Sequence, residues 1–192
     1  GCSAQGTLGA CQRCAASDAP DDQFIDENCD GIDGVVDGGI FVALLSGDDR
    51  NDGTPEAPLR TIHAALVLAQ GGARPIYVSQ GVYDGGLVID GAPARIHGGY
   101  ARAKSWRRGA DHEVRILAPA TGVIVSNVAG AVTLDRVNIQ SEPATTPSQR
   151  ASVGLRAISV EALRLRSLRI RAGRGLDGES GIDGPAGADG GA

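Results

Sequence analysis

Two copies of one pattern, "GVIVSNVAGAVTLDRVNIQ" at residues 122–140 and "GLRAISVEALRLRSLRIRA" at residues 154–172, decide the predicted fold. The copies align with one residue gapped, which pairs three apolar positions: Leu134 with Leu165, Val137 with Leu168, and Ile139 with Ile170. Within each copy the apolar residues alternate as in a strand, slip by one position, and then alternate again. A repeat of this kind predicts two similar structural units.

The slip distinguishes between two architectures. A single long strand would turn half of the apolar side chains toward water. Two short strands joined by a one-residue corner keep all of them facing one interior, and such a corner about once every twenty residues is typical of a parallel β-solenoid. We therefore expect an all-β, right-handed parallel β-helix. An antiparallel β-sandwich is the alternative, although it does not require the slip to recur.

The composition supports a fold of short strands and tight turns. The chain has 192 residues, of which 42% are hydrophobic and only 3% aromatic, with 29 glycines and no methionine. That much glycine suits turns better than a helical bundle. The stretch "LRTIHAALVLAQGG" has a helical period and ends at a glycine, so it predicts one capping helix at about residues 58–70.

The amino-terminal part of the chain is acidic and carries the cysteines. Residues 1–60 hold 12 acidic residues against 3 basic ones, and the rest of the chain is mildly basic. A zinc site would need two close cysteine pairs, and a redox C-x-x-C would need a strand and a helix around it. Two disulfides that staple a small acidic segment fit better and indicate an oxidising, extracytoplasmic location. The connectivity stays open among Cys2, Cys11, Cys14 and Cys29.

The stretch "DENCDGIDGVVD", residues 26–37, matches the spacing of a calcium loop of the EF-hand type. Hard oxygen ligands suit Ca²⁺, and Gly31 permits the sharp turn. Position 12 of the loop is an aspartate instead of the usual glutamate, and no flanking helices are evident. A solvated acidic turn is the alternative. The expected ligands are the side chains of Asp26, Asn28, Asp30 and Asp37, the carbonyl of Ile32, and Asp33 as a substitute.

Three further sets of residues have weaker functional interpretations. The turn "DDRND" is expected to cap the helix, with Asp49 and Asn51 as weaker cation ligands. A row of arginines follows in the second copy of the repeat: Arg164, Arg166, Arg169 and Arg171. We interpret it as an ordinary solvated face, in preference to a stripe that binds polyanions. Isolated histidines are expected at the surface or in turns, and isolated aromatic residues at corners; they are His63, His97, His112, Tyr83, Tyr100 and Trp106.

The chain divides into three regions: a cysteine-bearing acidic segment (1–38), the β-helix with its helix (39–174), and a tract with glycine at every third residue (175–192). The tract suits a collagen-like trimer, a polyproline-II bundle or a linker. No signal peptide, no apolar run long enough to span a membrane and no nucleic-acid surface is visible. The abrupt ends suggest a processed form or an excerpt, and Gly1-Cys2 is compatible with a lipoprotein cleavage site.

The middle of the chain resembles the pectin-lyase-like right-handed β-helix proteins of the surface and secreted type found in myxobacteria. The resemblance covers roughly residues 40–175 and rests on "GDDRNDGTPEAPLRTIHAAL", "IYVSQGVYDG" and "IHGGYARAKSWRR". The stretch "FIDENCDGIDG" resembles metal-binding segments that precede such domains, and glycine-triplet tails also recur beside them.

The resemblance implies a fold more strongly than an activity, because this β-helix carries lyases and hydrolases as well as adhesins. A lyase would need aspartates clustered on adjacent coils, and Asp135 stands alone. We therefore expect a calcium-stabilised extracellular or cell-surface structural or adhesive protein that associates with itself or with other surface proteins. The alternatives are a carbohydrate-binding or polysaccharide-cleaving β-helix and a trimeric collagen-like stalk.

Overall fold

The computed structural model describes residues 14–69, 74–178 and 181, and these are mostly strands with one α-helix. The first half contains β1 (Ile40–Val42), α1 (Ile62–Ala69), β2 (Ile76–Ser79), β3 (Gly81–Asp84), β4 (Leu87–Asp90), β5 (Ala94–Ala101), the 3₁₀ turn η1 (Arg102–Lys104) and β6 (Arg107–Arg108). The second half contains β7 (Val114–Ala118), β8 (Thr121–Asp135), β9 (Val137–Ser141), β10 (Val153–Arg166) and β11 (Ile170–Arg171).

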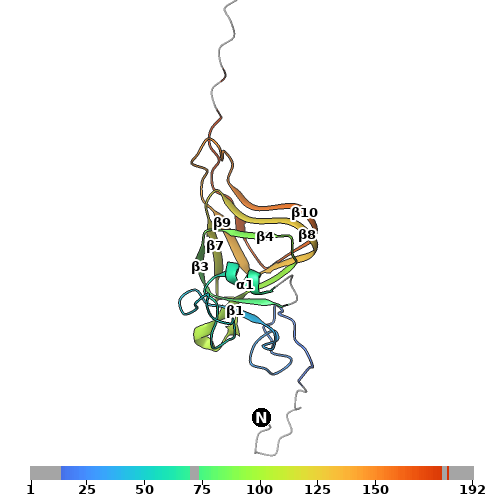
Figure 1. The fold of residues 1–192 in the computed structure, drawn as a ribbon. Coiled ribbons are helices and arrows are strands. Elements are labelled where there is room, and N and C mark those ends of the chain that lie inside the picture. The colour runs from blue at the N-terminus through green and yellow to red at the C-terminus, as the bar shows by residue number, and fades with distance from the viewer. Residues whose placement is uncertain (1–13, 70–73, 179–180, 182–192) are drawn as a thin grey trace, which may run out of the picture.

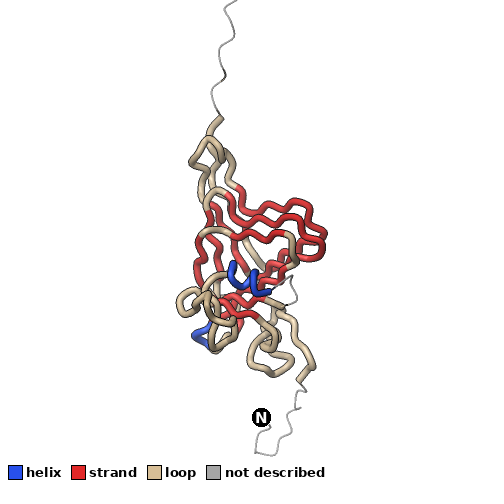
Figure 2. Tube along the Cα trace, viewed as in Figure 1, coloured by secondary structure: helices blue, strands red, loops and turns tan. Residues whose placement is uncertain are grey.

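The strands form two sheets (Figures 1 and 2). The first sheet has the order β1-β2-β5-β8-β10, with β4 beside β8 and the short β6 antiparallel to β5. The second sheet has the order β11-β9-β7-β3. Every other strand pair among the described residues is parallel. Parallel pairing excludes the hairpins of an antiparallel sandwich.

The two sequence copies lie side by side in the register that their alignment predicts. Leu134 pairs with Leu165 between β8 and β10, and Ile139 pairs with Ile170 between β9 and β11. The register shifts between Val160 and Ala162, which accounts for the gap in the alignment. The predicted one-residue corner is confirmed at Arg136, which has a left-handed φ of 53° and separates β8 from β9.

The corner keeps both apolar phases of the first copy inside. Val132 and Leu134 before it, and Val137 and Ile139 after it, each expose at most 1% of their surface. They belong to one cluster of aliphatic side chains between the two sheets. Gly98 on β5 makes the corner possible, because a Cβ there would lie 2.3 Å from the carbonyl oxygen of Arg136. A larger residue would push the corner away from the sheet.

Helix α1 packs against one end of the first sheet, where it contacts β1, β2 and β4 (Figure 2). It begins later than the sequence predicts, because Leu59 continues the sheet by bridging Val42. Thr61 caps the helix through a hydrogen bond from the amide of Ala64 to its hydroxyl. Asp49 in turn accepts hydrogen bonds from the amides of Arg60 and Thr61 and from the Thr61 hydroxyl. The capping role of "DDRND" is therefore confirmed.

A second, aromatic cluster joins the described part of the acidic segment (residues 14–38, below called the acidic segment) to the first sheet. Phe41 contacts both Tyr77 and Trp106, with ring centroids 5.2 and 4.8 Å apart. Ile32 of the segment and Tyr100 of β5 complete this cluster. Trp106, Tyr100 and Tyr83 expose no more than 6% of their surfaces, so these aromatic rings serve packing, as the sequence predicts.

The acidic segment contains one disulfide, between Cys14 and Cys29. Cys2 and Cys11 lie outside the described residues, as does most of the glycine-triplet tract, so their pairing and the state of the tract stay predictions. The acidic segment and residues 172–178 lie at opposite ends of the molecule (Figure 1). No helix in the described ranges is long and apolar enough to cross a membrane.

Candidate functional site

The calcium-loop residues form a compact turn. Both carboxylate oxygens of Asp26 accept backbone amides, from Asp30 at 3.0 Å and from Gly31 at 2.9 Å. Asn28 donates to the Asp30 carboxylate at 2.9 Å and to the Gly34 carbonyl at 3.1 Å. Asp30 accepts the amide of Val36 at 2.7 Å. The loop therefore brings three of the predicted oxygen donors together.

The other predicted ligands differ in position. Asp37 is exposed and forms no hydrogen bond or ion pair within the described residues, so its carboxylate is available. Asp33 instead points into the protein and pairs with Arg108 at 2.9 Å, which removes its side chain from the loop. No group of three or more histidine, cysteine, aspartate and glutamate side chains gathers around a common metal position in the described ranges. Asp49 and Asn51 hold their turn, and their weaker role as cation ligands stays a prediction.

A buried ionic network attaches the acidic segment to the sheet. Arg108 pairs with Asp33 at 2.9 Å and with Asp135 at 2.7 Å, and it donates to the carbonyls of Gly98 and Asp21. The three charged side chains expose at most 1% of their surface. Losing one partner of such a buried pair destabilises a protein by about 3–5 kcal/mol. The network therefore fixes where the segment docks.

His97 completes the network, with Nδ1 lying 3.2 Å from the Asp135 carboxylate. Burial lowers the pKa of His97 in spite of that carboxylate, so the imidazole is neutral at neutral pH. Burial opposes the negative charge of Asp135, but His97 and Arg108 outweigh it and hold its pKa below the ordinary value. Burial raises the pKa of Asp33 against the effect of Arg108. Asp135 is therefore the firmer counter-charge for Arg108.

Exposed contacts extend this docking across both copies of the repeat. Asp22 accepts hydrogen bonds from Arg136 at 2.9 Å and from Ser167 at 3.0 Å, and these donors lower its pKa. The guanidinium group of Arg136 also lies 4.5 Å from the ring centroid of Phe24. Arg136 and Ser167 are the corner residues of the two copies, with φ of 53° and 47°. The acidic segment thus binds the corners directly.

The predicted arginine row is divided between two surfaces. Arg164 and Arg166 precede the corner at Ser167 and line a cavity on the outer face of the first sheet. Arg169 and Arg171 follow the corner and line a groove on the outer face of the second sheet. A continuous stripe along one face is therefore wrong, because the corner turns the chain between the two pairs.

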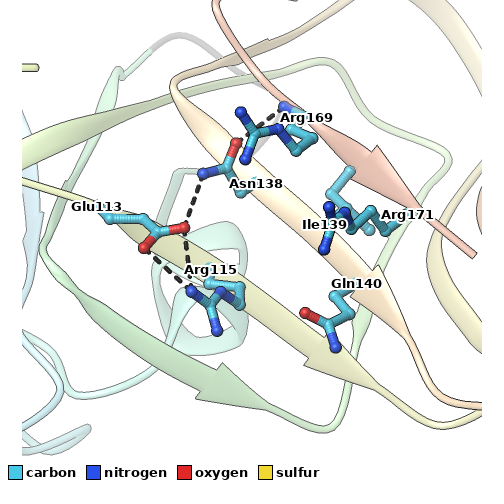
Figure 3. A pocket seen from close by; sticks show the side chains of 7 residues that line it. All are labelled: Glu113, Arg115, Asn138, Ile139, Gln140, Arg169 and Arg171. Atoms are coloured by element: carbon cyan, nitrogen blue, oxygen red, sulfur yellow. Dashed lines mark hydrogen bonds and ion pairs between the residues drawn. The ribbon is translucent and has the colours of Figure 1, made fainter.

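The groove on the second sheet has a volume of about 130 Å³ and is lined mainly by polar side chains of β7, β9 and β11 and of the residues just before β7 and β11 (Figure 3). Asn138 stands at its centre, donating to Glu113 at 3.0 Å and accepting the amide of Arg169 at 2.8 Å. Arg115 also pairs with Glu113 at 3.1 Å. The side chains of Gln140 and Arg171 make no hydrogen bond or ion pair within the described residues.

The polar side chains that line the groove can form hydrogen bonds with a ligand. The amide of Asn138, followed by Arg115, holds the pKa of Glu113 below its ordinary value, so Glu113 is a carboxylate at neutral pH. It is the one carboxylate among the described residues that line the groove. Amide and guanidinium groups in a row suit hydroxyl-rich or anionic ligands, because they offer several fixed donors. The groove is therefore a candidate binding surface.

Comparison with known proteins gives one match. Residues 45–88 match the family DUF1565, described as a protein of unknown function, and this family is associated with parallel β-helix proteins. The matched stretch contains α1, β2 and β3, and with them "GDDRNDGTPEAPLRTIHAAL" and "IYVSQGVYDG", two of the three stretches on which the resemblance rests. No curated protein matches the chain, and no solved structure matches it.

The ionic network is the main feature that the sequence did not predict. Asp135 was expected to stand alone, and His97 was expected at the surface or in a turn, but it is buried within β5 at 7% exposure. His112 lies in a bend, as expected, although it is buried at 4% exposure. His112 lies 3.2 Å from the carbonyl of Gly99. A carboxylate in an alternating strand beside an arginine-rich turn is the one signal that could have indicated the pairing of Asp135 with Arg108.

Proposed function

We propose that the two parallel sheets are walls of a right-handed parallel β-helix. The support is that successive segments of each sheet pair in parallel, that β10 is in register with β8 at 11 residue pairs from Val153 to Arg166, and that corners recur at equivalent residues. The matched family is associated with the same fold. The acidic segment would then cover one flank of the β-helix, and α1 would cap the amino-terminal end of the β-helix.

We propose that this protein is an extracellular or cell-surface structural or adhesive protein. The observation that carries the proposal is the last copy of the repeat, where β10 and β11 each pair on one side only among the described residues. This edge presents unpaired backbone groups together with half-exposed Ile158, Leu165 and Ile170. An open parallel edge of this kind is a surface for association with other chains. The disulfide agrees with an oxidising compartment.

Calcium would stabilise the acidic segment. The side chains of Asp26, Asn28, Asp30 and Asp37 and the carbonyl of Ile32 would hold it, and the donor chemistry fits because all are hard oxygens. The ion would supply positive charge beside Asp26, Asn28 and Asp30, which the loop already brings together. Each carboxylate oxygen already bound to a backbone amide keeps a further lone pair for the ion.

Sedimentation velocity tests the association proposal. The wild-type protein is expected to self-associate as its concentration rises, and Ile170→Asp, which places a charge at the open edge, is expected to abolish that association. The control is Val88→Asp, because Val88 is also an exposed apolar strand residue but lies on β4, which is distant in sequence from the open edge. A wild-type protein that stays monomeric at every concentration, with no partner captured through this edge, contradicts the proposal.

The groove in Figure 3 favours a second candidate function, which is carbohydrate binding on the flank of the β-helix. Gln140 of β9 is in register with Arg171 of β11, and Asn138 lies two residues before Gln140 on the same strand, so these side chains offer donors to hydroxyl or carboxylate groups. Binding of a saccharide that is lost in Arg169→Gln/Arg171→Gln would support this second function over the first.

A further inference from the structure

A cavity of about 450 Å³ lies between the acidic segment and the outer face of the first sheet. Its floor is formed by Arg95, Thr133 and Arg164, which come from β5, β8 and β10. Residues of the acidic segment, among them Pro20 and Asp37, form the opposite wall. The cavity is thus made by the docking of the segment and is separate from the groove on the second sheet.

The floor residues form one line across the sheet. Arg95 pairs with Thr133, and Thr133 pairs with Arg164, so the three side chains stand side by side. Neighbouring strands lie about 4.8 Å apart, which places a hydroxyl group between two guanidinium groups. Arg166, the next outward residue of β10, also lines the cavity and donates to the carbonyl of Pro20 at 3.4 Å.

Positive charge exceeds negative charge in this cavity. Four arginines line it, the fourth being Arg74, against the two carboxylates of Asp18 and Asp37. The Asp18 carboxylate is already engaged by the amides of Gly34 at 2.9 Å and Glu27 at 3.3 Å. The Arg164 side chain makes no hydrogen bond or ion pair within the described part of the chain. A concave site with an excess of one sign of charge concentrates ions of the opposite sign.

We propose that this cavity binds a small organic anion of about the size of a sugar acid. The carboxylate or sulfate group of the ligand accepts hydrogen bonds from Arg164 and from the hydroxyl of Thr133, while its apolar face packs against Pro20 and Pro75. The volume suits a small ligand, since pockets for such molecules measure roughly 300–1,000 Å³. The wall formed by the acidic segment favours a small molecule over a long polymer. This inference does not rest on the proposed structural role.

Isothermal titration calorimetry with glucuronate tests the proposal, with glucose as the neutral control ligand. Arg164→Gln is expected to weaken glucuronate binding about 10-fold or more, because a hydrogen bond to a charged group contributes about 1.5–3 kcal/mol. Thr133→Val, which keeps the shape of the side chain, is expected to weaken it several-fold. The matched control is Arg156→Gln, which removes the same charge from an exposed position of the same strand outside the cavity.

The other ligands and variants decide between explanations. Glucose 6-sulfate bound in place of glucuronate supports the same site with sulfate as the recognised group. Glucose bound as tightly as glucuronate, or triglutamate bound more tightly, overturns the proposal. Full binding by Arg164→Gln and loss of binding by Arg169→Gln/Arg171→Gln also overturns it and assigns the ligand to the groove. Thermal unfolding checks that each variant is folded. We expect Arg164→Gln to fold, because Arg164 is exposed.

Discussion

The two copies of the repeat have the same backbone path but different surroundings. In the first copy, Leu134 and Ile139 expose at most 1% of their surfaces, whereas their partners in the second copy, Leu165 and Ile170, expose 41% and 39%. The reason is that β8 has strands on both sides, while β10 has a partner on one side only among the described residues. The sequence pattern determines the strands and the corner, and the neighbouring strands determine the burial.

The outer faces of the two copies differ as well. Asp135 of the first copy is buried under the acidic segment, and its register partner in the second copy, Arg166, is exposed. The first copy therefore has a buried ionic network at the position where the second copy has an exposed arginine. The two equivalent positions of the repeat therefore differ in both respects: one holds a buried negative charge and the other an exposed positive charge.

The largest difference between the copies is expected in the core. Leu134→Ala should lower the free energy of unfolding by about 3–5 kcal/mol, because it removes a fully buried side chain and leaves a cavity. Leu165→Ala should lower it by only about 1 kcal/mol, since that side chain is already half in water. Urea unfolding followed by circular dichroism measures both. Equal losses would show that the open edge is covered in solution.

The next difference concerns the outer face. Asp135→Asn should lower the free energy of unfolding by about 3 kcal/mol, because Arg108 then keeps only Asp33 as a buried counter-charge. Arg166→Gln at the equivalent position should change it by less than about 0.5 kcal/mol, as for most surface substitutions. The same unfolding measurement compares them. If Asp135→Asn leaves the free energy of unfolding unchanged, the network contributes nothing to the docking of the segment.

The smallest expected effect is that of calcium on the segment that covers the first copy. At a calcium concentration roughly 100 times the Kd, binding stabilises the folded loop by about 2.7 kcal/mol, so amide exchange in residues 14–38 should slow about 100-fold while exchange in β10 stays unchanged. Hydrogen–deuterium exchange with calcium and with EDTA measures this.

The matched variants for the calcium experiment keep the shape of the side chains. Asp26→Asn/Asp30→Asn should lose the slowing, and Asp84→Asn should keep it, because Asp84 is an exposed carboxylate on β3, outside the acidic segment. Slowing of equal size in all three proteins would show that calcium acts elsewhere.

The repeat could be predicted from the sequence because its signals are local. The slip between Leu134 and Val137 indicates a corner, since an alternating pattern changes phase where the chain turns or a residue is inserted in the strand, and here the same slip recurs in both copies. The helix was predicted for the same reason, although its start was placed too early. Leu59 fits a helical period and a strand equally well, and only the presence of β1 beside it decides for the sheet.

The sites were harder to predict because they depend on partners distant in the chain. Arg108 meets Asp33 across 75 residues and Asp135 across 27, and no periodicity connects such positions. The arginine row failed for a related reason. Arg166 and Arg169 are only three positions apart in the sequence, yet the corner at Ser167 directs them to different sheets.

The long reach of the acidic segment has a consequence for how the protein acquires its structure. Its contacts join Asp33 to Arg108, Asp22 to Arg136 and Asp22 to Ser167, over separations of 75, 114 and 145 residues. The segment is synthesised before the surface that receives it, because Arg108, Arg136 and Ser167 all follow it in the chain. Complete docking therefore requires that β10 has been made, and the carboxylates of Asp22 and Asp33 are without these partners before that point.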